Sequence, residues 1–118
     1  MIDLTEVKAN FAPGWINWIE CGEGWYPLIA ETHCRLKELD PGYKINQIKE
    51  KFGGLRFYWE PSKDLSNENW KKAHNIEYEA EDRSLKICEV CGKPGHRRNN
   101  GWLKTLCDKH AVELEYAP

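Results

Sequence analysis

Residues 88–92 read Cys-Glu-Val-Cys-Gly, and residues 107–110 read Cys-Asp-Lys-His. The first stretch is a C-x2-C pair and the second is a C-x2-H pair, with fifteen residues between Cys91 and Cys107. Two ligand pairs at this spacing predict one tetrahedral Zn²⁺ site made by Cys88, Cys91, Cys107 and His110. Because four protein ligands leave no open position for water, the expected role of this single zinc is structural.

Two other assignments of metal ligands remain open from the sequence. His96 lies five residues after Cys91 and could replace His110, although the fixed spacing to Cys107 favours His110. A second metal cluster could be built from Cys21, His33 and Cys34. The usual state of such cysteines is a buried free thiol, so the second cluster is the weaker hypothesis.

The segment between the two ligand pairs predicts a small zinc-binding fold. The Gly92–Gly95 turn leads out of the first pair, and residues 96–98 and 101–106 can form a β-hairpin about Asn99-Asn100-Gly101. Cys107 then opens a helix over Asp108–Glu115, whose amino end favours the thiolate form of Cys107. A knuckle, a hairpin and a helix that supplies the last two ligands form a treble-clef arrangement.

The N-terminal third predicts helices and one buried segment. Helical periodicity predicts an amphipathic helix over residues 27–39, with Glu31 and Arg35 paired on its surface. A short helix is expected over Glu6–Phe11. The apolar segment Trp15–Ile19 is too dense in large side chains for a loop, and we expect it to be buried.

Residues 44–60 predict a β-hairpin. Lys44–Phe52 and Leu55–Glu60 flank Gly53-Gly54, which can supply the positive φ angles of a tight primed turn. With Phe52 opposite Leu55, one face carries Ile48, Glu50, Phe52, Leu55, Phe57 and Trp59. The other face carries Lys49, Lys51, Arg56 and Tyr58. Glu50 breaks the apolar alternation, so it either pairs with a buried cation or lies at a bulge.

A long polar helix is expected from about Asn67 to Arg83, capped by Ser66 or Asp64. These elements predict an α+β fold, with a small antiparallel sheet (the hairpin at 44–60) packed by helices and a C-terminal treble-clef-like zinc unit. A chain of 118 residues suits one compact domain. Since no flexible linker is evident, we expect a body of residues 1–84 with the zinc unit, residues 85–118, docked on it.

Composition and charge limit the function classes. A hydrophobic content of 41% with 12% aromatic residues excludes a disordered chain. The sequence contains neither a secretory signal pattern nor a membrane-spanning run, and its odd number of cysteines indicates a reducing compartment, so we expect a cytoplasmic protein without a membrane partner. The formal net charge of −2 divides into −5 over residues 1–82 and +3 over residues 83–118.

Two basic and aromatic clusters are the candidate partner-binding surfaces. The first is the hairpin face with Lys49, Lys51, Arg56 and Tyr58, and the second is the zinc hairpin with Arg97, Arg98, Trp102 and Lys104. Such clusters bind nucleic acid in some protein families and bind protein partners in others. A solvated face without a partner is the simpler reading of the first. Because the chain is acidic overall, a protein partner is favoured over nucleic acid.

The sequence contains none of the common hydrolase, phosphate-loop or deaminase motifs, so we expect a protein that is not an enzyme. An HNH-like metal-dependent nuclease is the distant alternative, because it also uses a hairpin and a helix. It would need His96 as a general base and a further metal site. The oligomeric state does not follow from the sequence.

Three segments carry a resemblance to a family. Residues 47–58 read QIKEKFGGLRFY, residues 88–95 read CEVCGKPG, and residues 101–110 read GWLKTLCDKH. The chain looks like small proteins encoded by tailed phages and prophages, which share an IKEKFGGLRFY-like segment and a C-terminal CxxC…CxxH zinc segment. The resemblance implies an accessory protein in the host cytoplasm that binds and blocks a host protein, such as a component of a CRISPR–Cas defence system.

Overall fold

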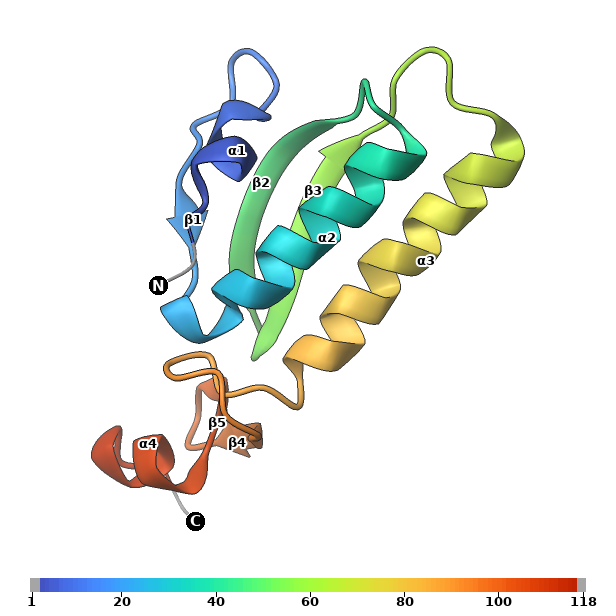
Figure 1. Ribbon diagram of the computed structural model, residues 1–118. Helices are drawn as coiled ribbons and strands as arrows, with labels where there is room; N and C mark the ends of the chain where they lie inside the picture. The colour runs from blue at the N-terminus through green and yellow to red at the C-terminus, as the bar shows by residue number, and fades with distance from the viewer. Residues whose placement is uncertain (1–2, 117–118) are drawn as a thin grey trace.

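The two sheets and four α-helices of the computed structural model, which describes residues 3–116, confirm the α+β fold (Figure 1). The outermost residues of the two expected units, Met1, Ile2, Ala117 and Pro118, lie outside the described part of the chain. In chain order the elements are α1 Thr5–Ala9, β1 Ile19–Glu20, the 3-10 turn η1 Glu23–Trp25, α2 Tyr26–Leu39, β2 Lys44–Lys51, β3 Gly54–Glu60, α3 Asn67–Ser84, β4 His96–Asn99, β5 Leu103–Leu106 and α4 Asp108–Glu113.

The predicted hairpin is formed by β2 and β3, but its turn lies one residue earlier than expected. Glu50 pairs with Leu55 and Lys51 with Gly54, so Phe52 and Gly53 are the two turn residues. Their φ angles of 55° and 82° are both positive, as a type I′ turn requires. The placement of Phe52 on the apolar face is therefore wrong, and its side chain is 59% exposed.

The sheet has a third strand that the sequence pattern did not predict. β1 lies parallel to β2, with Ile19 opposite Ile48, and gives the order β1-β2-β3. The expected burial of the segment before it is wrong, since Trp15 is 49% exposed and Trp18 is 65% exposed. Ile19 lies in β1 at the edge of the sheet and packs against the core. The residues that precede Ile19 extend into solvent.

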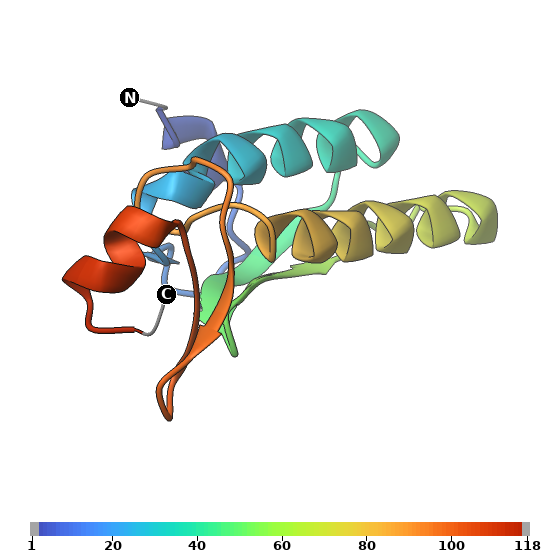
Figure 2. The ribbon, with the colours of Figure 1, turned by 90° about the horizontal axis from the view of Figure 1, so that it is seen from below.

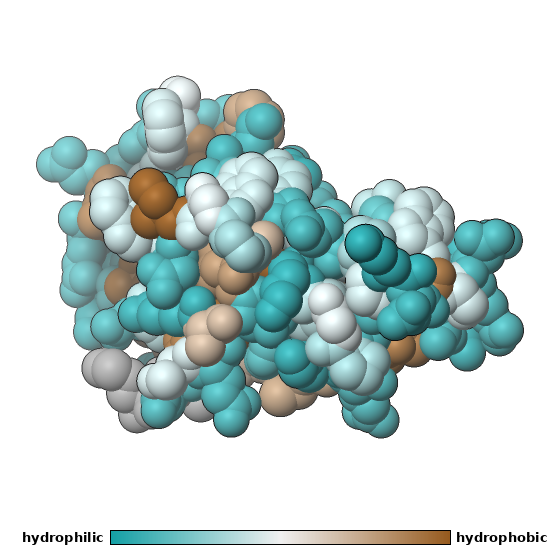
Figure 3. Space-filling model, turned by 90° about the horizontal axis from the view of Figure 1, so that it is seen from above, coloured by the Kyte–Doolittle hydropathy of each residue, from teal (hydrophilic) through white to brown (hydrophobic). Residues whose placement is uncertain are grey.

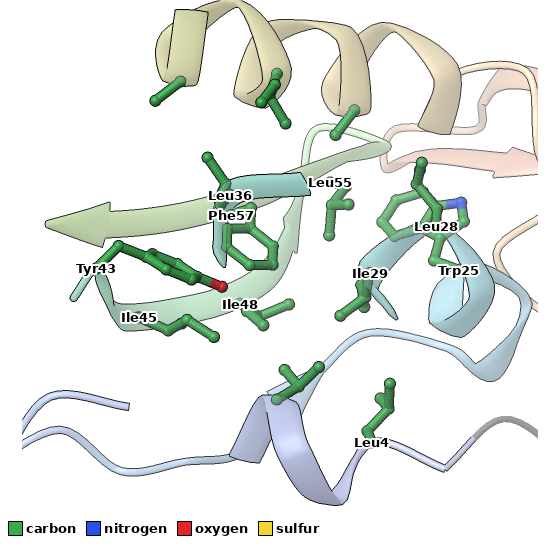
Figure 4. Close-up of a cluster of buried hydrophobic side chains, with 14 residues drawn as sticks. Leu4, Trp25, Leu28, Ile29, Leu36, Tyr43, Ile45, Ile48, Leu55 and Phe57 are labelled. Atoms are coloured by element: carbon green, nitrogen blue, oxygen red, sulfur yellow. The ribbon is translucent and has the colours of Figure 1, made fainter. Parts of the chain in front are cut away.

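The hydrophobic core lies between the sheet and two helices. α2 and α3 cover the same face of β2 and β3 (Figure 1), and the buried side chains of these elements point toward one another (Figure 4). The largest fully buried side chains of this cluster are Trp25, Ile29, Leu36, Tyr43, Ile45, Ile48, Leu55 and Phe57. The apolar stripe of α3 is thin and contributes Ala73, Ile76 and Ala80.

The two long helices match their predicted ranges but not their predicted ion pairs. The Ser66 hydroxyl caps α3 by accepting a hydrogen bond from the backbone N–H of Asn69. The expected pairing of Glu31 with Arg35 within α2 is wrong, because both side chains reach across to α3. Arg35 contacts Glu79 at 3.1 Å, and Glu31 contacts Arg83. Exposed pairs of this kind contribute about 1 kcal/mol or less.

The zinc unit lies against the body at the end of the sheet that carries the β2–β3 turn (Figure 2). The indole N–H of Trp25 donates to the Ile87 carbonyl at 2.9 Å, and the Thr105 hydroxyl donates to the Gly53 carbonyl at 2.6 Å. Gly24 packs so closely that a Cβ atom there would lie 2.1 Å from the Cys88 carbonyl oxygen. The two parts therefore share a close contact surface.

Hydrophilic residues cover most of the face seen in Figure 3, and strongly apolar residues emerge only in small, separate areas. Several large aromatic side chains are nevertheless exposed, including Trp15, Trp18, Phe52, Trp70 and Trp102. None of the helices within residues 3–116 has the length and apolar character that a membrane crossing requires.

Candidate metal centre and partner surface

The structure brings Cys88, Cys91, Cys107 and His110 together. Their ligand atoms all lie within 4.8 Å of one another. The first two cysteines come from the knuckle after α3, while Cys107 is the N-cap of α4 and His110 lies in its first turn. The backbone closes the knuckle through hydrogen bonds from Gly92 N–H to the Cys88 carbonyl and from Cys88 N–H to the Lys93 carbonyl. Gly92 supplies the positive φ of 83° at its end.

The spacing of these atoms fits a tetrahedral zinc ion. Two sulfurs that each lie about 2.3 Å from zinc are about 3.8 Å apart, and a sulfur and an imidazole nitrogen are about 3.5 Å apart. The Cys91 and Cys107 sulfurs are separated by 3.8 Å. Nδ1 of His110 lies 3.7 Å from Sγ of Cys88 and 3.2 Å from Sγ of Cys107. The cluster can therefore hold one metal ion.

The thiol pKa values differ across the cluster. A hydrogen bond from the backbone N–H of His110 is the main cause that lowers the pKa of Cys107 to about 6. At Cys91 the backbone N–H of Lys93 favours the thiolate, but desolvation and the neighbouring thiols outweigh it and raise the pKa. Three thiols this close do not ionise together unless a cation offsets their charge, which a divalent metal does.

The alternative ligands lie elsewhere. His96 is exposed on β4 and does not belong to the cluster. The Cys21, His33 and Cys34 side chains form no metal-binding group within residues 3–116. Nδ1 of His33 instead makes a buried hydrogen bond of 2.5 Å with the Tyr43 hydroxyl, and desolvation lowers the pKa of His33.

A charge network joins the metal knuckle to the body. Nζ of Lys104 lies 3.2 Å from Glu89 and 3.3 Å from Glu50. The same carboxylates accept hydrogen bonds from the backbone N–H groups of Gly22 and Gly53. Although desolvation alone would lower the pKa of Lys104, the two carboxylates raise it. Of the two interpretations of Glu50, pairing with a cation is correct, and the register shift lies instead between Ile45 and Gln47.

Replacing Lys104 with methionine is expected to lower the free energy of unfolding by about 2 kcal/mol, because Glu50 and Glu89 would lose their cation. The loss is smaller than for a fully buried pair, since Lys104 is 27% exposed. Chemical denaturation measures it, with exposed Lys109→Met as the control. Adding Glu50→Gln and Glu89→Gln to Lys104→Met should recover part of the loss, and an unchanged stability in Lys104→Met would contradict the role of the network.

Several residues of the two candidate partner surfaces make intramolecular contacts. Arg56 pairs with Glu81 at 3.0 Å, and Lys104 belongs to the network above. Arg98 is only 5% exposed, because its guanidinium donates to the Leu106 carbonyl and to Asp108, so its prediction as a surface residue is wrong. The residues of the two surfaces that remain outside such ion pairs within the described chain are Lys49, Lys51, Tyr58, Arg97 and Trp102.

The two hairpin tips form one groove, although the sequence suggested two separate surfaces. Arg97 of β4 donates to the Phe52 carbonyl, and the tips lie side by side in Figure 2. A hollow of about 530 Å³ between them is lined by Glu50, Lys51, Phe52, Asn99, Gly101, Trp102 and Leu103. We call this hollow the hairpin-tip groove. Phe52 was missed as a surface residue because its exposure depends on which two residues make the turn.

Functional assignment depends on this geometry. Comparison of the chain with protein-family models, with curated proteins and with solved structures gave no match. The resemblance to phage-encoded proteins therefore stays a hypothesis. Residues 3–116 form an α+β protein with a Cys3His cluster that can hold a metal ion.

Proposed function

We propose that this chain is a non-enzymatic, zinc-containing protein that binds another protein at near-unit stoichiometry through the hairpin-tip groove. The proposal rests on the finding that Trp102 and Phe52 line the same groove. Trp102 comes from the zinc hairpin and is 67% exposed, whereas Phe52 comes from the body. Zinc acts here as a structural ion, because it holds together the unit that presents one wall of the groove.

The backbone at Phe52 supports a binding role for its side chain. A bulky residue at positive φ carries a conformational cost of about 1–2 kcal/mol that glycine or asparagine largely avoids. The ring does not recover this cost by burial, since it is mostly exposed. A strained, solvent-exposed aromatic residue is a reasonable candidate for a contact with a partner.

The charge distribution favours a protein partner over nucleic acid. Non-specific nucleic-acid binding depends on cations that are free to neutralise phosphates. Arg56, Arg98 and Lys104 are each paired with carboxylates of the same chain. Exposed aromatic rings beside few free cations are typical of the centres of protein interfaces.

The class of partner follows from the resemblance described above. A phage-encoded accessory protein would act in the host cytoplasm and would bind a host protein. Inhibition of a host defence system, such as CRISPR–Cas, is the corresponding biological role. A nucleic-acid-binding accessory protein is the alternative, and an HNH-like nuclease is the distant one.

Phe52→Asn and Trp102→Ala are expected to weaken partner binding at least tenfold, as loss of interface hot spots does. Because asparagine tolerates positive φ, Phe52→Asn should keep or raise the stability of the fold. Pull-down from the host, followed by calorimetry with the purified partner, measures binding, and Trp70→Ala on α3 is the exposed-tryptophan control.

Three outcomes would contradict this proposal. Binding that survives Phe52→Asn and Trp102→Ala would place the interface elsewhere. A nucleic-acid partner would be indicated if nuclease treatment abolished the recovery of the partner in the pull-down. Its binding would also depend steeply on salt, and Arg97→Ala or Lys49→Ala would flatten that dependence. Plasmid cleavage that needs a divalent metal and is lost in His96→Ala would indicate a nuclease.

A further inference from the structure

We propose a second recognition site, in which the pocket between Trp15, Trp18 and Glu20 takes a basic side chain of a protein partner, arginine in preference to lysine. The pocket has a volume of about 270 Å³ and is lined by Gly14, Trp15, Ile16, Trp18, Glu20, Asn46 and Gln47. Ligand sites for whole small molecules usually measure about 300–1,000 Å³, so this hollow suits a single side chain. We call it the tryptophan pocket.

The apolar side chains of the tryptophan pocket are exposed, but hydrogen bonds hold the backbone segment that carries them. Trp15 is 49% exposed, and Ile16 and Trp18 are each 65% exposed. The segment that carries them is held by hydrogen bonds from Asn17 to the Lys8 carbonyl and from Trp15 N–H to the Ala12 carbonyl. A held loop with several exposed apolar side chains is the arrangement that a binding site needs.

The charge of the pocket selects the ligand. Glu20 is the one ionisable residue among the lining residues, and the described ion pairs of residues 3–116 do not include it. Gln47 donates a hydrogen bond to Oε2 of Glu20, which leaves Oε1 available. Lys49 is the register neighbour of Glu20 on β2 and makes no ion pair with it. A carboxylate beside exposed indole rings favours a cation.

Arginine fits this chemistry better than lysine. Its planar guanidinium stacks on aromatic faces and carries five N–H donors, whereas lysine presents a compact, strongly hydrated ammonium. Asn46 also lines the pocket, and its Oδ1 atom, which is buried beneath the pocket surface, forms no hydrogen bond in residues 3–116. A rotation of this amide would offer the oxygen to a second guanidinium N–H. The site therefore matches a ligand with several donors in one plane.

The tryptophan pocket is separate from the hairpin-tip groove. Asn46 and Gln47 lie near the start of β2, whereas Lys51 is its last residue and Phe52 follows it in the turn. An experiment that contradicts binding at one site therefore does not contradict binding at the other. The two sites can serve one partner or two.

The test uses the whole 118-residue chain, loaded with zinc and labelled with ¹⁵N, and follows its six indole N–H signals by NMR. The probes are Nα-acetyl-arginine amide, its lysine analogue and its citrulline analogue, which keeps the shape of arginine without the charge. The arginine probe should shift the Trp15 and Trp18 signals, with lysine weaker and citrulline about tenfold weaker, as loss of a cation–π contact predicts. Glu20→Gln should weaken arginine binding at least threefold and Trp18→Leu about tenfold. Trp70→Leu, on α3, should change nothing.

Four results would overturn the proposal. Equal binding of arginine and citrulline would show that the pocket does not recognise charge. If no probe shifted the Trp15 and Trp18 signals, the pocket would not be a binding site. Perturbation of Trp15 and Trp18 by vesicles containing anionic lipid, without a response to arginine, would assign the segment to a membrane surface. Shifts of the same signals with protein concentration alone would assign it to self-association. The spectrum of each variant also reports whether it is folded.

Discussion

Replacing Cys88 with serine is expected to abolish zinc binding and to unfold at least residues 88–115. Cys88 is fully buried at the centre of the small cluster that contains Leu106, Ala111 and Tyr116. Four such residues bury too little apolar surface to fold alone, so we expect a bound metal to supply most of the stability of this unit. Structural zinc contributes an apparent ~10–16 kcal/mol in finger peptides, which rivals the ~5–15 kcal/mol of a whole domain.

Metal analysis of the purified variants and hydrogen exchange of residues 88–115 measure this effect, and Cys107→Ser should behave in the same way. Cys34→Ser is the matched control, because Cys34 is exposed on α2 and lies outside the metal cluster. It should retain one zinc per chain and the protection of the wild type. Retention of one zinc per chain in Cys88→Ser or Cys107→Ser would contradict the assigned ligand set.

Replacing Trp25 with alanine is expected to lower the free energy of unfolding by about 3–5 kcal/mol. The side chain is fully buried in the core cluster, next to Leu28 (Figure 4), so its removal leaves a large cavity. The variant also loses the hydrogen bond from the indole to the Ile87 carbonyl, just before the first metal ligand. We therefore expect faster hydrogen exchange in the zinc unit as well as lower global stability.

Chemical denaturation compares Trp25→Ala with Trp70→Ala. Trp70 is 45% exposed, and its ring makes a tilted contact with the His74 ring at a centroid distance of 4.1 Å, so its replacement should cost no more than about 1.5 kcal/mol. If the two variants lost equal stability, Trp25 would not be the link between the core and the zinc unit.

Local patterns in the sequence predicted the elements that depend on local chemistry. The paired spacing of Cys88, Cys91, Cys107 and His110 indicated the metal cluster, because ligand pairs must lie within one knuckle or one helical turn. The periodicity of residues 27–39 and the cap at Ser66 indicated α2 and α3, because both are properties of single helices.

The features that the sequence did not predict depend on contacts between distant residues. β1 has only two residues, and it becomes a strand by pairing with β2. Glu31 and Arg35 have suitable spacing within α2, yet α3 offers each a partner that no local rule reveals. The first turn residue is Phe52, although glycine is usually preferred at positive φ. The Gly53-Gly54 dipeptide therefore predicted the turn one residue too late.

The dependence on contacts between distant residues also explains why the sequence did not predict the partner surfaces correctly. Charge counts identified Arg56, Arg98 and Lys104 as available cations, but each is paired with a carboxylate from another part of the chain. The hairpin-tip groove and the tryptophan pocket were not predicted, because each joins residues of at least two segments. Binding surfaces of this kind require the tertiary structure.

One zinc ion is expected to organise the C-terminal unit and thereby to complete the hairpin-tip groove. Titration of the chelator-treated, reduced protein with Zn²⁺, followed by NMR of the backbone amides, measures this effect. We predict saturation at one equivalent, with the signals of residues 88–115 becoming dispersed together with those of Phe52 and Gly53. Saturation at a different stoichiometry would contradict this expectation. So would a spectrum in which residues 88–115 are already ordered before zinc is added.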